Sequence, residues 1–250
     1  MRSTDSAICI RTADFSETSQ VVHFLTRSGG VVRLLAKGAK RPKSKTGGAM
    51  DLLSEGQLVY STTSRESLGI LMEFSETVSR SPLRRDAQRL NIALYMIELV
   101  GDMLAEADPH VEVFDLLHNS LARMGQADAP LAAVLAYFQW RLLRCVGLLG
   151  DMTQCVSCGC QIKLANPAAE EVYFTSGEGG LLFRACEGSA VEKFLLDEQT
   201  RAGLAVLLSV EVRRKMPLSE AQARKASRLL SYHITHQLGK QLKMARHVIL

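Results

Sequence analysis

The hydrophobic periodicity of the chain changes at Pro82, and this change constrains the fold more than any other feature. Five short apolar runs before it have the composition of strands, and they cover residues 7–12, 21–26, 31–35, 57–63 and 68–74. Gly29-Gly30 separates the second run from the third, as a hairpin turn would. Five strands in such a short segment favour a small barrel, because closure removes the exposed edges of an open sheet.

After Pro82, apolar residues recur with the spacing of helices. The helical faces cover residues 90–104, 111–124 and 131–149. Near the C-terminus, Ser219 and Gln222 form a capping-box pattern that starts another helix, and Gly239 ends it. The predicted fold class is therefore α+β: a barrel domain at 1–80 and a helical domain at 81–250, with a cysteine-bearing insert at about 150–190.

Composition places the chain among ordinary globular proteins. Of its 250 residues 47% are hydrophobic and 22% are charged, which allows a sizeable core without disulfides. No apolar run approaches the ~20 residues of a membrane span, and no signal-peptide stretch follows Met1–Asp5. We expect a cytoplasmic protein, associated with the nucleoid if it binds DNA. In that compartment its six cysteines are thiols or metal ligands.

A run of cations lies between the third and fourth expected strands. It consists of Lys37, Lys40, Arg41, Lys43 and Lys45, and no acidic residue occurs from Ser28 to Met50. Pro42 and the neighbouring glycines oppose a helix, so these cations belong to a loop. Cations on a barrel loop suit a phosphate backbone, because each neutralised phosphate releases counterions. The alternative is a solvated loop without a ligand.

Aromatic side chains that could stack on bases are scarce near this loop. The candidates are Phe15, Phe24, Tyr60 and Phe74. Most of them sit in strand patterns typical of a core, which favours backbone contact over base reading. A second basic stretch, which could also be a solvated helix face, comprises Arg213, Arg214, Lys215, Arg224, Lys225 and Arg228.

The segment Cys155–Gly159 has the CxxCG pattern of a zinc knuckle. Tetrahedral zinc requires four ligands, and the downstream segment supplies Cys186 but has Phe183 where a paired cysteine would stand. Cys160 is the candidate fourth ligand. The alternative is a degenerate ribbon with free thiols, held by apolar packing of Val172, Phe174, Leu181 and Phe183.

Motifs of common enzymes are missing from the sequence. It has no Walker-type phosphate loop, dinucleotide fingerprint, nucleophile elbow or HExxH motif. His233 and His236 lie three apart on an expected helix without an evident carboxylate partner, and we interpret them as ordinary surface or interface histidines. The sequence therefore favours a protein that binds rather than catalyses.

These features together resemble the RecO family of DNA-repair proteins. The stretches that carry the resemblance are IRTADFSETS (10–19), AKGAKRPKS (36–44), FQWRLLR (138–144), CVSCG (155–159) and FTSGEGG (174–180). The resemblance implies an N-terminal OB-fold, a helical C-terminal domain, no catalytic turnover and, in many members, a zinc ribbon. This sequence departs from the zinc-bearing pattern at Phe183, and some members lack zinc.

The resemblance also implies partners. Such proteins bind single- and double-stranded DNA, anneal complementary strands, work with RecR, and help load RecA onto DNA coated with single-strand-binding protein. They bind the acidic, apolar C-terminal tail of that protein on the helical domain. We place this site at Arg141 and Arg144, which share one side of a helix. Trp140 is expected to project from another face than the core stripe.

Two other functions compete with this interpretation. A zinc-ribbon transcription or translation factor would read duplex DNA or RNA and would not anneal strands. A hydrolase or nuclease without a recognisable motif would cleave labelled DNA in the presence of divalent metal.

Overall fold

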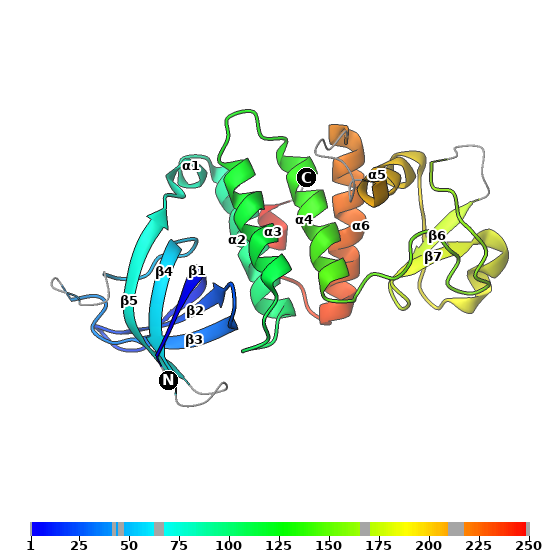
Figure 1. Cartoon of the computed structure of the whole chain (residues 1–250). Helices are drawn as coiled ribbons and strands as arrows, with labels where there is room; N and C mark the ends of the chain where they lie inside the picture. The colour runs from blue at the N-terminus through cyan, green and yellow to red at the C-terminus, as the bar shows by residue number, and fades with distance from the viewer. Residues whose placement is uncertain are drawn as a thin grey trace. The chain divides into compact units, whose positions relative to one another are not determined.

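The computed structural model confirms the predicted α+β class, with five strands followed by helices (Figure 1). It describes residues 2–41, 44, 48–62, 68–165, 171–209 and 218–248. The strands of the first sheet are β1 (Arg2–Asp14), β2 (Gln20–Thr26), β3 (Gly30–Ala36), β4 (Glu55–Ser61) and β5 (Gly69–Val78). Each overlaps a run that the period-two pattern predicted.

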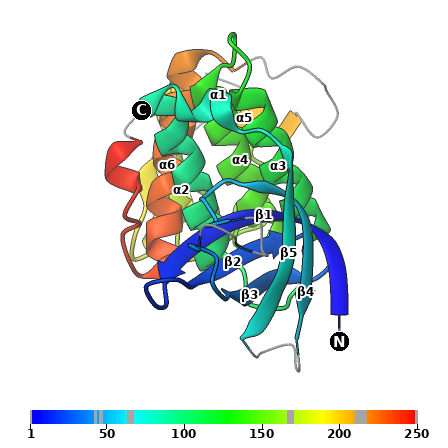
Figure 2. The same cartoon turned by 90° about the vertical axis from the view of Figure 1, so that its left-hand side faces the viewer.

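The first sheet closes into a barrel with the strand order β1-β2-β3-β5-β4. Neighbouring strands are antiparallel except β3 and β5, which run parallel, so the chain crosses over between them as in a Greek-key barrel of the OB type. Figure 2 shows these strands curving around one another. The barrel core is made by Ala7, Cys9, Val22, Phe24, Val32, Leu34, Ala36, Ala39, Met50, Leu58, Tyr60, Leu71 and Phe74.

Three helices belong to the same compact unit as the barrel. They are α1 (Ser81–Arg84), α2 (Ala87–Met103) and α3 (Val111–Met124). The first compact unit spans Met1–Ala129 and includes Leu242–Val248, whereas the second spans Pro130–Gln241. The contacts group these three helices with the strands. The expected domain boundary near residue 80 stays a prediction.

A buried ion pair explains part of this grouping. Nε of Arg80 donates to Oε2 of Glu55 at 3.0 Å, and both side chains are buried, with 5% and 6% of their surface exposed. The His118 ring on α3 hydrogen-bonds the other oxygen of Glu55. Arg80 thus joins β4 to α3, while α2 packs against β1.

The end of the described chain returns to the first unit. The Glu98 carboxylate on α2 accepts the backbone N–H groups of Lys243 and Met244, each at 2.8 Å. The short helix η3 (Ala245–His247) follows this contact.

In its described residues, the second unit contains three α-helices and a small sheet. The helices are α4 (Leu131–Cys145), α5 (Glu198–Ser209) and α6 (Glu220–Leu238), and α6 packs against the other two. The capping box of Ser219 and Gln222 is present, and Gly239 ends α6 with a φ of 62°, as predicted. The insert holds η1 (Arg184–Ser189) and the strands β6 (Val172–Thr175), β7 (Gly180–Phe183) and β8 (Phe194–Leu195), in the order β7-β6-β8.

The parts of the chain that the structure describes include no helix with the length and hydropathy needed to cross a bilayer.

Candidate metal centre and nucleic-acid interface

Three cysteines of the insert meet in space. The sulfur atoms of Cys155, Cys158 and Cys186 all lie within 4.8 Å of one another. The first two come from the CxxC knuckle, and the third comes from η1, directly after β7. Three converging thiols are close enough to bind one metal ion.

The knuckle has the local structure that metal-binding thiols require. Gly159 adopts a φ of 73° and donates its N–H to the carbonyl of Cys155 at 2.9 Å, which closes the turn. Val156 N–H donates to Leu181 O at 2.8 Å and fastens the turn to β7. The glycine and the strand contact therefore hold the two cysteines in place before any ion binds.

The electrostatics of Cys155 favour a thiolate. Burial alone would raise the pKa of this thiol, but hydrogen bonds from the backbone N–H groups of Cys158, Phe183 and Ser157 outweigh burial and lower the pKa to about 7. Phe183 occupies the position where a paired cysteine was expected, so it supports the cluster through its main chain. A thiolate held by N–H donors is the form that binds metal.

Cys160 lies beside the cluster but outside the group of three. A hydrogen bond with Cys158 raises the pKa of the Cys160 thiol, so the two sulfurs are neighbours. The backbone carbonyl of Cys160 also accepts the N–H of Cys155 at 2.9 Å. The three grouped thiols are close enough to bind one metal ion, and a structural zinc site would need a fourth ligand beside them.

The insert also has an apolar core of its own. Val172, Phe174 and Leu181 are buried, while Phe183 is half-buried. This packing is the feature that a ribbon without metal would need, and it coexists with the thiol cluster.

The basic loop begins where β3 ends. Gly38 adopts a φ of 69° and donates its N–H to Oγ of Ser19 at 3.0 Å, while Lys40 N–H donates to Thr18 O at 3.0 Å. The start of the loop, residues 37–41, is therefore fastened to the turn between β1 and β2. Fixed backbone geometry lowers the entropy lost when a loop binds a ligand.

The cations of this loop are not equivalent. Lys37, Lys40 and Arg41 are exposed, but Nζ of Lys40 lies 2.6 Å from a carboxylate oxygen of Asp14. Lys43 and Lys45 lie outside the described residues. The loop thus presents exposed cations, one of which already has an anionic partner.

The expectation for the aromatic residues holds for three of the four. Phe24, Tyr60 and Phe74 are buried in the barrel, whereas the Phe15 side chain is 62% exposed in the β1–β2 turn. Sequence reasoning did not separate Phe15 from the others. The sequence feature that could have identified Phe15 as exposed is its place between the polar residues Asp14 and Ser16, where the alternating strand pattern ends.

A second basic feature depends on strand register and was missed. Arg11 pairs with His23, and His23 pairs with Arg33, so three basic residues form a row across β1, β2 and β3. Burial and the nearby Arg11 lower the pKa of His23, and Arg33 lies 3.9 Å from Glu106. Only the pairing of the strands could have shown this row.

The C-terminal basic stretch is partly neutralised where the structure describes it. Arg224 pairs with Glu220 at 2.6 Å, and Lys225 pairs with Asp197 at 2.7 Å. Arg228 is exposed on α6. Arg213, Arg214 and Lys215 lie outside the described residues.

Two expectations for the helical domain need correction. Trp140 is fully buried rather than projecting from another face of α4, because nearly every residue of this helix up to Leu143 is buried. His233 is also buried, with its ring nitrogen Nε2 2.7 Å from the carbonyl of Leu148, so it is a core histidine. Arg141 is half-buried and Arg144 is exposed.

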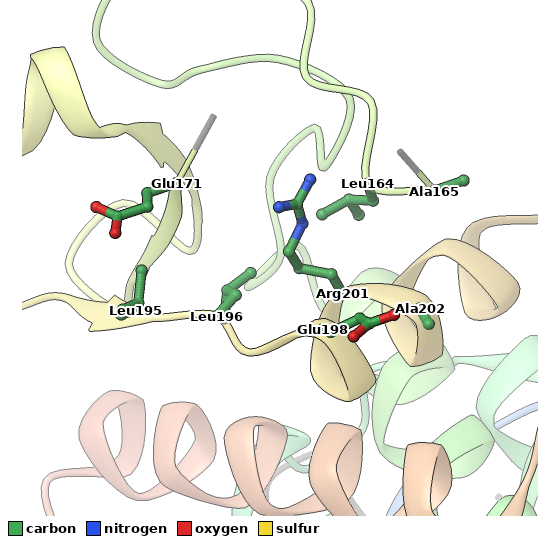
Figure 3. Close-up of a pocket in the computed structure, with 8 residues that line it drawn as sticks. All are labelled: Leu164, Ala165, Glu171, Leu195, Leu196, Glu198, Arg201 and Ala202. Carbon is green, nitrogen blue, oxygen red and sulfur yellow. The ribbon is translucent and has the colours of Figure 1, made fainter. Parts of the chain in front are cut away.

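A pocket of about 390 Å³ lies in the second unit (Figure 3). Its apolar lining comes mainly from Leu164, Leu195 and Leu196. Arg201 rises from α5 into this lining, and the residue is only 7% exposed. The pocket therefore combines apolar surface with the Arg201 guanidinium group and the carboxylates of Glu171 and Glu198.

Comparison with known proteins agrees with the resemblance seen in the motifs. The family model "Recombination protein O N terminal" matches residues 1–78, and "Recombination protein O C terminal" matches residues 84–246. The DNA repair protein RecO of Anaeromyxobacter dehalogenans (strain 2CP-C) is 31% identical, over 96% of this chain and 93% of the relative. That of Syntrophus aciditrophicus (strain SB) is 27% identical, over 94% and 90%.

The two family models together span nearly the whole chain and meet near residue 80, and the relatives match at nearly full length. Family membership supports a role in DNA repair and recombination. The chain belongs to the RecO family.

Proposed function

We propose that this protein is a non-enzymatic recombination mediator that binds and anneals single-stranded DNA. One observation carries the proposal: a closed five-stranded barrel holds a cation-rich loop, with no acidic residue between Ser28 and Met50. Barrels of the OB type bind strands through such grooves and loops. The loop residues Lys37, Lys40, Arg41, Lys43 and Lys45 contact phosphates in this proposal.

The proposed partners follow from family membership. With RecR, the protein helps load RecA onto DNA that is coated with single-strand-binding protein. The C-terminal tail of that protein binds the helical domain at Arg141 and Arg144. Binding and exchange of strands need no catalytic group, which accords with a sequence that has no enzyme motif.

Zinc has a structural role in this proposal. Cys155, Cys158 and Cys186 hold the ion, and Cys160 supplies the fourth thiolate. A closed site of four thiolates fixes the insert and leaves no position for water or substrate. The ion would stabilise the knuckle against β7 and take no part in any reaction.

A strand-annealing assay on DNA precoated with single-strand-binding protein tests the proposal. The wild type should accelerate annealing, and alanine at the five loop cations should slow it. A duplex-reading regulator would not anneal strands, and a nuclease would shorten the labelled DNA when divalent metal is added. Wild-type protein without any effect on annealing would contradict the proposal.

A further inference from the structure

The β1–β2 turn presents an unusual side chain beside the basic loop. All eight phenylalanines of the chain fall within the described residues, and Phe15, at 62%, is the one with a largely exposed side chain. Burial of a phenylalanine ring away from water stabilises a protein, and an exposed ring does not contribute this free energy. An exposed aromatic ring is therefore a candidate contact for a ligand.

The backbone holds this turn in a defined shape. Phe15 N–H donates to Ser19 O at 3.0 Å, and Ser16 N–H donates to the same oxygen at 3.2 Å. The Ser19 side chain, buried at 6% exposure, accepts Gly38 N–H from the basic loop. The ring of Phe15 thus stands on a turn that hydrogen bonds fix to the loop.

The start of the basic loop is linked to the turn that carries this ring. Asp14, which holds Nζ of Lys40, immediately precedes Phe15. Lys40 N–H donates to Thr18 O, and Arg41 N–H donates to Gly38 O at 3.1 Å. One fastened structure therefore combines an exposed aromatic ring with Lys37, Lys40 and Arg41.

This combination matches the chemistry of an unpaired nucleotide. Every base offers a flat face that stacks on an aromatic ring, and its phosphates pair with cations at either side. In a duplex the neighbouring bases already cover that face. The arrangement therefore distinguishes single strands from duplex without reading sequence.

We propose that Phe15 is a stacking platform for one unpaired base, with phosphates of the same strand held by Lys37, Lys40 and Arg41. The inference rests on the proposed binding of single strands by the barrel. It goes beyond that proposal because it assigns a base contact, where the sequence favoured contact with the backbone alone.

The test compares two oligonucleotides of about 12 nucleotides, within the site size of one such barrel. One is oligo(dT), and the other has the same backbone with abasic sites. Fluorescence anisotropy of the labelled strands gives the Kd for each. Phe15→Ala should weaken oligo(dT) binding about 5- to 10-fold and leave the abasic strand and a duplex unchanged.

Matched variants separate stacking from other effects. Phe15→Trp should keep wild-type affinity because it retains a flat aromatic face, whereas Phe15→Leu should behave like Phe15→Ala. Met72→Ala removes another exposed apolar side chain, 41% exposed on β5, and should change nothing. The melting temperature of Phe15→Ala should equal that of the wild type.

The outcomes distinguish this inference from the proposed function. If the wild type binds oligo(dT) and Phe15→Ala binds it equally well, the stacking inference is wrong while strand binding stands. An equal loss on the abasic strand also overturns stacking. Failure of the wild type to bind either strand would overturn both proposals.

Discussion

The ammonium group of Lys40 lies 2.6 Å from a carboxylate oxygen of Asp14, so an ion pair joins the basic loop to the end of β1. Part of the charge that the sequence assigned to this loop is therefore already paired. The side chain of Asp14 is the more exposed partner, and a phosphate that approaches Lys40 competes with it. We therefore expect the loop cations to contribute unequally to DNA affinity, with Lys40 contributing less than Lys37 and Arg41.

Alanine at Lys37 and Arg41 should weaken DNA binding for all sequences. Each lost phosphate contact should reduce the slope of log K against log salt by roughly 0.7 to 0.9. Lys40→Ala should have a smaller effect, because Asp14 already pairs with this ammonium, and Asp14→Asn should tighten binding. Affinities measured over a range of salt concentrations check these expectations. Lys163→Ala, which removes an exposed cation of the insert, is the control, and an unchanged slope in the loop variant would place the phosphates elsewhere.

The thiol cluster predicts close to one zinc ion per chain. Elemental analysis of protein purified without chelator should find it, and Cys186→Ser should abolish it. Cys160→Ser should release zinc more readily to a competing chelator. Cys145→Ser on α4 is the matched control and should keep the ion. Zinc retention should fall as the pH falls, because the ligands must be thiolates.

The apolar core of the insert predicts what happens when zinc is removed. Val172, Phe174 and Leu181 remain packed without the ion, so the circular dichroism and the main melting transition should change little. If elemental analysis found no zinc in protein purified without chelator, the proposed metal site would be wrong. Global unfolding on chelation would show instead that the insert depends on the metal.

The Glu55–Arg80 pair predicts a large stability effect within the first unit. Arg80→Met leaves a buried carboxylate without its cation and should cost about 3 to 5 kcal/mol in the free energy of unfolding. The double variant Glu55→Leu/Arg80→Met should recover part of this loss, because no uncompensated charge remains. Denaturant titration measures both. Arg27→Ala breaks an exposed pair with Asp115 and should have little effect.

His233 predicts a pH dependence of stability. Burial lowers its pKa below the ordinary value of 6.5, so the unfolded chain binds a proton more readily than the folded one. Its contribution to stability is present above pH 6.5 and is lost as the pH falls from there through the lowered folded pKa. Urea unfolding at about pH 7.5 and about pH 5.5 should show a smaller difference in His233→Phe than in the wild type. His236→Gln, on the exposed side of α6, should keep nearly the full difference.

Much of this fold could be predicted because it depends on local pattern. The five strands follow from alternation, α3 begins at Val111 and ends at Met124 as the periodicity indicated, and Ser219 and Gly239 bound α6. In contrast, the Arg11–His23–Arg33 row depends on strand register. The contact of Glu55 with His118 joins residues 63 positions apart, which no local pattern encodes.

The candidate sites also divide into features that follow from local sequence and features that depend on the folded structure. The cysteine spacing identified the cluster, but the support that the Phe183 main chain gives to Cys155 became visible only with the hairpin folded. Trp140 was misplaced because amphipathic spacing indicates one buried face, whereas α4 is buried on nearly all sides. His233 was misplaced because its polar ring suggested the surface, although it lies on the buried face of α6 with Ala226 and Leu230. Phe15 was grouped with the core aromatics, although it lies in the exposed turn that follows β1, between Asp14 and Ser16.

The tail of single-strand-binding protein provides the last prediction, which rests on family membership. Arg141 and Arg144 are three apart on α4, so they lie on one side of the helix and can face the carboxylates of one peptide. Arg141→Glu/Arg144→Glu should weaken binding of a synthetic tail peptide roughly tenfold, the scale of one lost charge-assisted hydrogen bond. Affinity for naked DNA should remain nearly intact, and Lys163→Glu, an exposed charge reversal in the insert, is the control. If the folded double variant bound the peptide with wild-type affinity, the tail site would have to lie elsewhere. The pocket beside Arg201 would then be the next to test, since it combines a guanidinium group with apolar surface.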